Sequence, residues 1–128
     1  MLKSQEKRDR VTVVLPAYNA VRTLEKIYKD IPKKIVSNII LVDDGSKDNT
    51  VSLSKKLGIK TIIHKKNLGY GANQKTLYKA ALKDGADYII MLHPDGQYDP
   101  KDLPLFINAL KGGRGDIILG SRFLSTGG

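Results

Sequence analysis

The sequence predicts an α/β protein built on a mostly parallel sheet with helices on both faces. Short, almost continuously apolar runs alternate along the chain with stretches of helical periodicity, which is the pattern of strands buried on both sides. Hydrophobic residues make up 41% and charged residues 27% of the composition, as in ordinary globular proteins. A chain of 128 residues fits one domain and can bury roughly two thirds of its unfolded surface.

The first strand and the first helix are both delimited by prolines. The β-branched run VTVVL predicts a strand over 11–15, which Pro16 closes. Apolar residues then recur at helical spacing through VRTLEKIYKDIP, and we expect Pro32 to end that helix. The chain therefore opens with a strand, a loop and a helix.

The same unit recurs along the rest of the chain. Gly58 and Gly85 follow helical patterns and are expected to stop those helices, while Asp99 and Pro100 are expected to begin the last one. No linker, low-complexity tract or sequence repeat interrupts the alternation. A second strand is predicted to begin at residue 38, and further strands are predicted over 60–64, 87–92 and 116–120. The later helices are predicted over 48–58, 71–85 and 99–113.

Polar residues follow four of the predicted strands, and these strand ends are the main sequence signal for function. They read PAYN, DDGS, HPDGQ and GSR in chain order. Ligands in parallel sheets bind outside the carboxyl ends of the strands. We therefore expect the four strand ends to form one ligand site.

The chain carries a formal charge of +9, from 22 basic and 13 acidic residues. Lysine pairs at 33/34, 55/56 and 65/66 suit a polyanion or an anionic membrane surface, although a solvated surface is the simpler interpretation of any one pair. No pair is interleaved with aromatic residues, so nucleic-acid binding is not predicted. With no cysteine, no apolar run of about 18 residues and no signal-peptide core, we expect a cytoplasmic chain, neither secreted nor membrane-spanning.

Three loop motifs each have a functional and a plain structural interpretation. The carboxylates of VDDGS could accept hydrogen bonds from a base or ribose, or cap a turn and a helix. NLGYGANQ matches neither the G-x-G-x-x-G spacing nor a Walker loop; its amides could face an anion, or it could be a flexible loop before a helix. In HPDGQYDP, His93 and Asp95 could bind a divalent ion or belong to a turn.

Taken in order, PAYN, VDDGS, NLGYGANQ, HPDGQYDP and GSR resemble the motifs of family-2 glycosyltransferases with the GT-A fold. The likeness is strongest to the branch of polyprenyl-phosphate sugar synthases that includes dolichol-phosphate mannose synthase. It runs from about Val11 to Arg122, which is nearly the whole chain. The resemblance implies a Rossmann-like, mostly parallel sheet that binds a nucleotide sugar, in a hexosyltransferase-like enzyme.

The resemblance also implies roles for the first three motifs. Tyr18 would pack on the nucleobase, while Ala20 stands where the family has a glutamate that contacts the nucleoside. Asp44 matches the acid that contacts the base, with Asp43 as its neighbour, and Asn73 lies one helical turn beyond the glycine near the nucleotide. The implied nucleotide-binding residues are Pro16, Tyr18, Val42, Asp44 and Gly69.

The family's metal motif is Asp-x-Asp, and here His93 replaces the first acid while Asp95 retains the second. The implied cofactor is a divalent metal, Mn²⁺ or Mg²⁺, bound by Asp95 and His93. Because imidazole is a softer ligand than carboxylate and cannot coordinate when protonated, we expect a weaker, pH-sensitive site that suits manganese better. Asp95, Gln97 and Arg122 would contact the phosphates and sugar of the donor.

The implied reaction is inverting transfer of a sugar from a UDP- or GDP-linked donor, with the metal stabilising the departing diphosphate. The expected acceptor is a polyprenyl phosphate, which would place the chain peripherally at the inner face of a membrane. We expect residues 1–10 to be a charged leader and 11–128 to be the donor-binding half of the domain. The acceptor side and catalytic base of the family lie beyond FLSTGG, so we assign no catalytic residue and do not expect turnover from this chain alone.

The main alternative is a non-catalytic nucleotide-binding or regulatory module that keeps the fold, since His93 and Ala20 depart from the family pattern. Metal-dependent donor binding would separate a transferase from such a module. A nucleotidyltransferase is disfavoured, because no Gly-rich loop with Arg and Lys follows the first strand. The sequence does not distinguish the donor base, the sugar, the acceptor or the oligomeric state.

Overall fold

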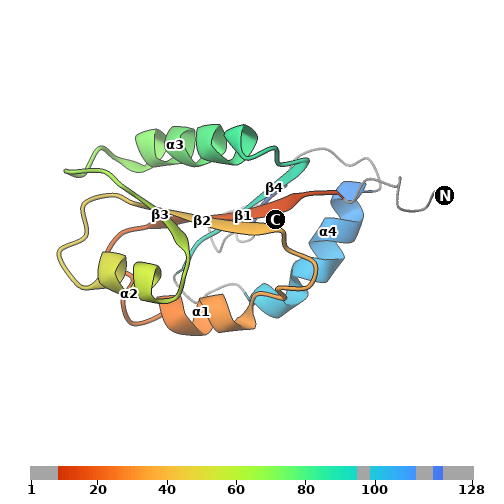
Figure 1. The fold of residues 1–128 in the computed structure, drawn as a ribbon, viewed down its shortest axis with the longest axis horizontal. Helices are drawn as coiled ribbons and strands as arrows, with labels where there is room; N and C mark the ends of the chain where they lie inside the picture. Colours follow the sequence, from red (N-terminus) through yellow and green to blue (C-terminus); the bar gives the residue numbers. More distant parts are fainter. Residues whose placement is uncertain (1–8, 95–98, 112–116, 120–128) are drawn as a thin grey trace, which may run out of the picture.

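A five-stranded parallel sheet lies between two layers of helices (Figure 1). The computed structural model describes residues 9–94, 99–111 and 117–119. The strands are β1 (Val11–Ala17), β2 (Asn38–Asp43), β3 (Lys60–Ile63), β4 (Tyr88–Leu92) and β5 (Ile117–Leu119). The helices are α1 (Leu24–Asp30), α2 (Thr50–Lys56), α3 (Tyr70–Lys83) and α4 (Leu103–Lys111), the last preceded by a 3-10 turn at Pro100–Asp102. The predicted fold class and element order are confirmed.

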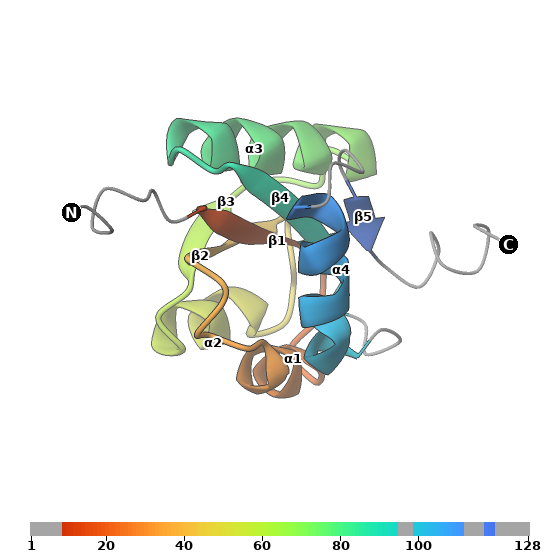
Figure 2. The same cartoon turned by 90° about the vertical axis from the view of Figure 1, so that its right-hand side faces the viewer.

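The two faces of the sheet are covered by different helices. Of the helices in the described part of the chain, α3 packs on one face, whereas α1, α2 and α4 cover the other, as Figures 1 and 2 show from two sides. The alternation of β1 separates these layers: Val13 and Leu15 belong to the cluster with α1 and α4, while Val14 packs with Leu77 of α3. The β1 residues of both clusters are at most 2% exposed, so β1 has apolar neighbours on both sides.

The first strand runs past its predicted proline boundary, whereas the first helix ends before Pro32 as predicted but begins later than its apolar spacing indicates. β1 continues through Pro16 to Ala17, because pairing with β4 ends at Val14 and, among the described strands, only β2 flanks β1 beyond that point. A proline can therefore continue β1 there. Helix α1 begins only at Leu24, because the preceding loop bonds to the β2–α2 loop instead of extending the helix.

The predicted stop signals of α2 and α3 and the predicted start signal before α4 are confirmed. Gly58 and Gly85, at φ +85° and +81°, follow α2 and α3 in the left-handed region that favours glycine. The Asp99 side chain accepts a hydrogen bond from Lys101 N at 2.9 Å and so caps the turn that leads into α4.

The strand order is β3-β2-β1-β4-β5, so the chain moves outward in one direction from β1 and then returns to the other side with β4. This reversal places a topological switch point between β1 and β4, where ligands bind in open α/β sheets. Within the described residues, no helix is both long and apolar enough to cross a membrane.

Candidate functional site

A cavity of about 910 Å³ opens at the carboxyl ends of β1, β2 and β4, at the switch point of the sheet. It is large enough for a small organic ligand. Four sequence-predicted residues, Pro16, Tyr18, Asp44 and Gly69, line it together with His93 of the predicted metal site. Its other lining residues are Ala17, Asn19, Ala20, Val21, Arg22, Thr23, Lys47, Asp48, Asn67, Tyr70, Asn73 and Pro94.

The loop after β1 presents an aromatic ring to this cavity. Tyr18 is 48% exposed and lines the cavity, whereas Pro16 before it is buried in β1. Asn19 has a φ of +50°, a left-handed conformation that asparagine tolerates better than most residues, and its backbone turns there. An exposed ring beside a cavity can stack on a planar ligand.

Hydrogen bonds attach the β1 loop to the β2–α2 loop. Asn19 N donates to Ser46 Oγ at 2.7 Å, and Ala20 N donates to Thr50 Oγ1 at 2.8 Å. In return, Lys47 N donates to the Asn19 side-chain oxygen at 2.8 Å. The two loops therefore form one wall of the cavity rather than two independent segments.

Asp48 is a further link in this wall. Its carboxylate accepts from Val21 N at 3.2 Å and from Thr50 N at 2.9 Å, and also from the Thr50 hydroxyl. Burial opposes ionisation of Asp48, but the hydrogen bonds from Thr50 and Val21 outweigh it and hold the pKa of the carboxyl below its usual value of 3.8. Asp48 is thus ionised, and its hydrogen bonds hold the β1 loop against the start of α2.

The two acids of VDDGS have different surroundings. Asp43 accepts from Gly45 N at 3.1 Å, from Ser46 N at 2.8 Å and from the Ser46 hydroxyl, so it stabilises the turn after β2. This is the plain structural interpretation of the motif. Asp44 instead lines the cavity, although its side chain is only 8% exposed.

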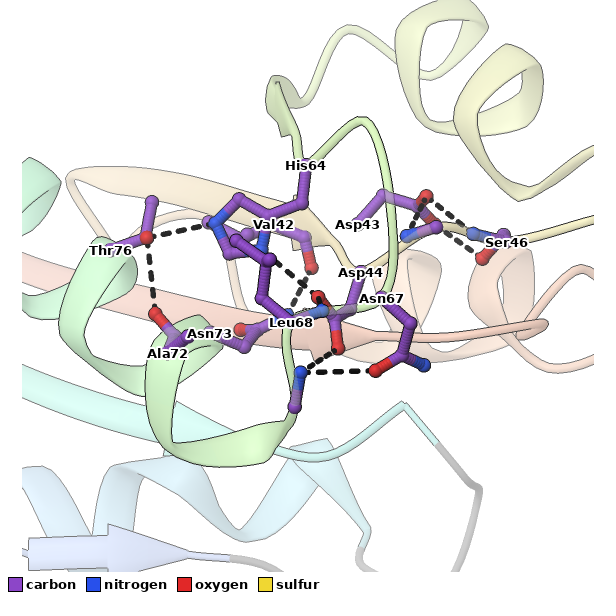
Figure 3. A network of polar contacts seen from close by, with 12 residues as sticks. Val42, Asp43, Asp44, Ser46, His64, Asn67, Leu68, Ala72, Asn73 and Thr76 are labelled. Carbon is purple, nitrogen blue, oxygen red and sulfur yellow. Dashed lines mark hydrogen bonds and ion pairs between the residues drawn. The ribbon is translucent and has the colours of Figure 1, made fainter.

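Asp44 holds the glycine loop against the end of β2 (Figure 3). Its Oδ1 accepts from Leu68 N at 2.9 Å, and its Oδ2 accepts from Gly69 N at 3.0 Å. The loop amides do face an anion, as one interpretation of NLGYGANQ required, but that anion is the protein's own carboxylate. Gly69 has a φ of +97°, which a residue with a side chain would rarely adopt.

His64 completes this network from the end of β3. Its Nδ1 lies 3.0 Å from Asp44 Oδ1, and its Nε2 lies 2.9 Å from the Thr76 hydroxyl, which donates to Ala72 O at 3.1 Å (Figure 3). Burial opposes ionisation of Asp44, but Leu68, His64 and Gly69 together hold the pKa of its carboxyl below 3.8.

Sequence reasoning missed His64 and Thr76 entirely. The usable signal was that His64 is the last residue of the strand predicted over 60–64, at the edge where the other polar residues gather.

Asn73 connects α3 to β2 beneath the cavity. It is 2% exposed, and its Nδ2 donates to the carbonyl of Val42 at 2.9 Å. Its side-chain oxygen is buried without a hydrogen-bond partner among the described residues. Val42 itself is fully buried in β2 and does not line the cavity in the described part of the chain, so its side chain supports the site from below.

The end of β4 brings His93 and Pro94 to the cavity. The His93 ring stacks on Tyr70, with centroids 5.5 Å apart and planes 24° apart, and His93 Nε2 lies 3.0 Å from the Tyr70 hydroxyl. The Thr23 hydroxyl donates to Pro94 O and so joins the β1 loop to this segment.

The structure describes only some of the residues predicted to bind the metal and the donor phosphates. Asp95, Gln97 and Arg122 lie outside the described residues. Among the residues that are described, no group of three or more His, Cys, Asp or Glu side chains could bind a metal ion. His93 is therefore the one predicted metal ligand that the described residues include, and its Nε2 has Tyr70 as a neighbour.

Comparison with known protein families gives a match over almost the whole chain. Residues 12–128 match the family described as Glycosyl transferase family 2. A UDP-N-acetylglucosamine–dolichyl-phosphate N-acetylglucosaminyltransferase of Methanococcus voltae is 30% identical over 129 aligned positions that cover 88% of this chain and 51% of the relative. A dolichol-phosphate mannosyltransferase of Pyrococcus furiosus is 31% identical over 125 positions, which cover 92% of this chain and 34% of the relative. The chain thus spans about half or less of the length of these relatives.

A solved structure shares the fold. Glucosyl-3-phosphoglycerate synthase from Mycobacterium tuberculosis, crystallised with Mn²⁺, uridine diphosphate and glucosyl-3-phosphoglycerate, superposes with a TM-score of 0.67. The match has 22% sequence identity and covers 80% of this chain and 39% of the neighbour. The likeness supports the predicted GT-A architecture of the sheet and its helices.

Proposed function

This chain belongs to glycosyl transferase family 2, and from that membership and the geometry of its cavity we propose that it binds the nucleoside-diphosphate sugar of a glycosyltransferase reaction. The observation that carries the proposal is the cavity at the β1/β4 switch point. It combines an exposed aromatic ring, Tyr18, with a rigid polar wall and the end of β4.

The proposed orientation of the donor follows from the chemistry of the lining. The nucleobase stacks on Tyr18 and meets the Asp44 side of the cavity, where the Gly69 backbone comes close without a side chain. Oδ2 of Asp44 accepts a hydrogen bond from Gly69 N and retains capacity to accept another from the base or ribose. The diphosphate then lies toward His93 and Pro94, with Gln97 and Arg122 as further contacts.

We propose that a divalent metal assists this chemistry, with His93 and Asp95 as its ligands. When bound, the metal would neutralise negative charge on the leaving diphosphate. The crystallised neighbour with Mn²⁺ and uridine diphosphate supports divalent-metal use within this fold. On the protein's side, His93 must give up its contact with the Tyr70 hydroxyl if Nε2 is to coordinate.

The proposed acceptor is a polyprenyl phosphate, and the proposed outcome is inversion at the anomeric carbon. Both relatives named above act on dolichol-linked substrates according to their descriptions, which supports a lipid phosphate acceptor here. Such an acceptor would bring the protein to the surface of a membrane as a peripheral partner. The net charge of +9 suits that surface.

Calorimetric titration tests the donor proposal. UDP, GDP and their sugar conjugates are titrated into the chain with Mn²⁺ and again with a chelator. We expect one diphosphate to bind preferentially and Tyr18→Ala to weaken it, while the matched variant Tyr18→Phe, which keeps the ring, binds nearly as the parent does. Absence of binding by the folded chain to every nucleotide would overturn the proposal.

The same titration separates the transferase from a non-catalytic nucleotide-binding module. A transferase that uses the proposed metal binds its donor more tightly with Mn²⁺ than with chelator, and the difference disappears in Asp95→Ala. Binding that is equally tight with chelator would favour the module.

A further inference from the structure

The charged side chains of the described cavity lining fall into two classes, and we infer from this division that Arg22 binds the phosphate groups of the donor. The acids are engaged by the protein's own amides, whereas the cations are not. This inference rests on the proposed function and extends it to a residue outside the motifs of the sequence.

The two carboxylates of the described cavity lining both accept hydrogen bonds from backbone amides of the framework. Asp44 accepts from two loop amides and contacts His64, and Asp48 accepts from the amides of Val21 and Thr50. The pKa of each carboxyl is lowered, so both are ionised at neutral pH with their charge directed at backbone donors. Each carboxylate keeps its negative charge, but its oxygens are occupied largely by the protein's own donors.

The two basic residues of the lining are in the opposite situation. Arg22 and Lys47 are exposed, and neither side chain has a hydrogen bond or ion pair with any residue that the structure describes. By contrast, Lys26 and Lys29 on α1, close in sequence to Arg22, are each paired with an acid one helical turn away. Among the described lining residues, the charge without a protein partner is thus positive, and it suits an anionic ligand.

The backbone around Arg22 is fixed on both sides. Val21 N donates to Asp48 at 3.2 Å, and the Thr23 hydroxyl donates to the carbonyl of Pro94. The bond from Thr23 ties the loop of Arg22 to Pro94 at the end of β4, and Arg22 lines the same cavity as His93, toward which the proposed diphosphate lies. The anchored loop lowers the entropy cost of ordering the side chain on a ligand.

The chemistry of the side chain matches the ligand. A guanidinium offers a planar fork of donors that fits two phosphate oxygens at once and stays charged at any relevant pH. Lys47 supplies a point charge on the neighbouring loop and would add attraction without that fork. Arg22 is therefore the residue of the described cavity best suited to a diphosphate.

A series of ligands with zero, one and two phosphates isolates the contribution of Arg22. Nucleoside, nucleoside monophosphate and nucleoside diphosphate of the preferred base are titrated into the parent chain, Arg22→Ala and Arg22→Lys. We expect Arg22→Ala to weaken diphosphate binding roughly tenfold to a hundredfold while nucleoside binding is unchanged, with Arg22→Lys in between. Where the nucleoside binds too weakly to measure, the step from monophosphate to diphosphate gives the same readout.

The matched control is Arg10→Ala, which removes the same charge at the opposite edge of the sheet, where the Arg10 backbone contacts Asp87 and Tyr88. Arg10→Ala should leave the affinity for each of the three ligands unchanged. Thermal unfolding of Arg22→Ala should match the parent, since the side chain has no partner among the described residues to lose.

The outcomes distinguish the two proposals. If the parent chain binds the diphosphate and Arg22→Ala binds it equally well, or loses nucleoside binding to the same extent, the assignment of Arg22 is wrong while the donor site stands. If the folded parent chain binds no nucleotide at all, the donor site itself is wrong and the assignment falls with it.

Discussion

His64 Nδ1 lies 3.0 Å from Asp44 Oδ1, and this pair joins the carboxyl ends of β3 and β2 at the edge of the cavity. The side chains are 10% and 8% exposed, so the contact is shielded from solvent. Because Asp44 also binds the amides of Leu68 and Gly69, the pair fixes the loop that leads into α3. One wall of the proposed nucleotide site therefore depends on a histidine outside the recognised motifs.

Replacement of His64 should loosen this wall. His64→Ala leaves a buried carboxylate with one donor fewer and Thr76 without its ring partner, which we expect to lower the free energy of unfolding by about 2 kcal/mol. Urea unfolding followed by circular dichroism measures the change, and calorimetry should show weaker nucleotide binding. Lys65→Ala, at the exposed neighbouring position, is the control. Equal stability of the two variants would show that the His64 contact contributes nothing.

Acid should destabilise the fold through Asp44 and Asp48. Both have a lower pKa in the folded protein than the usual 3.8, because hydrogen bonds favour their ionised forms over the effect of burial. A depressed folded pKa gives stability that is fully present above pH 3.8 and is lost as the pH falls through the folded value. We expect the urea midpoint to fall steeply below about pH 4.

Variants assign that acid sensitivity. Asp44→Asn and Asp48→Asn should each be less stable than the parent at pH 7, and each should lose less stability than the parent between pH 5 and pH 3. The measurement is the urea midpoint across this range. A parent-like slope in both variants would mean that other groups govern the acid transition.

The alternation of elements was predictable because each strand of this sheet is buried on both faces and so reads as a continuous apolar run. Local signals also set the ends of α2 and α3, where glycine alone adopts the required φ easily. The extension of β1 through Pro16 was not predictable, since it depends on β4 ending its pairing at Val14. Such a boundary is a property of the sheet rather than of the local sequence.

The site was predictable to the extent that it follows from strand ends. Tyr18, Asp44, Gly69 and His93 gather at one cavity because parallel strands bring their carboxyl ends to one edge. The partners of Asp44 were not predictable, because His64 lies 20 residues away and meets it only once β3 pairs with β2. Arg22 likewise gains significance only from the bonds that fix the loop around it.

Gly45 in the β2–α2 loop should be harder to replace than Gly58 after α2. A Cβ at this position would lie 2.9 Å from Asn67 N, and the φ of +85° is itself unfavourable for a side chain. Gly58 has the same φ of +85° but nothing within 4 Å of such a Cβ, which makes it a matched control. We expect Gly58→Ala to cost about 1 kcal/mol and Gly45→Ala at least about 1 kcal/mol more, measured by urea unfolding. Similar costs would mean that the loop around Asn67 yields without penalty.

Tyr70 should compete with a metal for His93. The Tyr70 hydroxyl lies 3.0 Å from His93 Nε2, so coordination through that nitrogen requires the contact to break. Tyr70→Phe keeps the stacked ring but removes the hydroxyl, and we expect it to bind Mn²⁺ several-fold more tightly in the presence of nucleotide, followed by calorimetry or electron paramagnetic resonance. His93→Ala should abolish that gain, because the released nitrogen is then absent. If Tyr70→Phe binds Mn²⁺ no better than the parent, Nε2 of His93 is not a metal ligand, and its role is to stack against α3 at the mouth of the cavity.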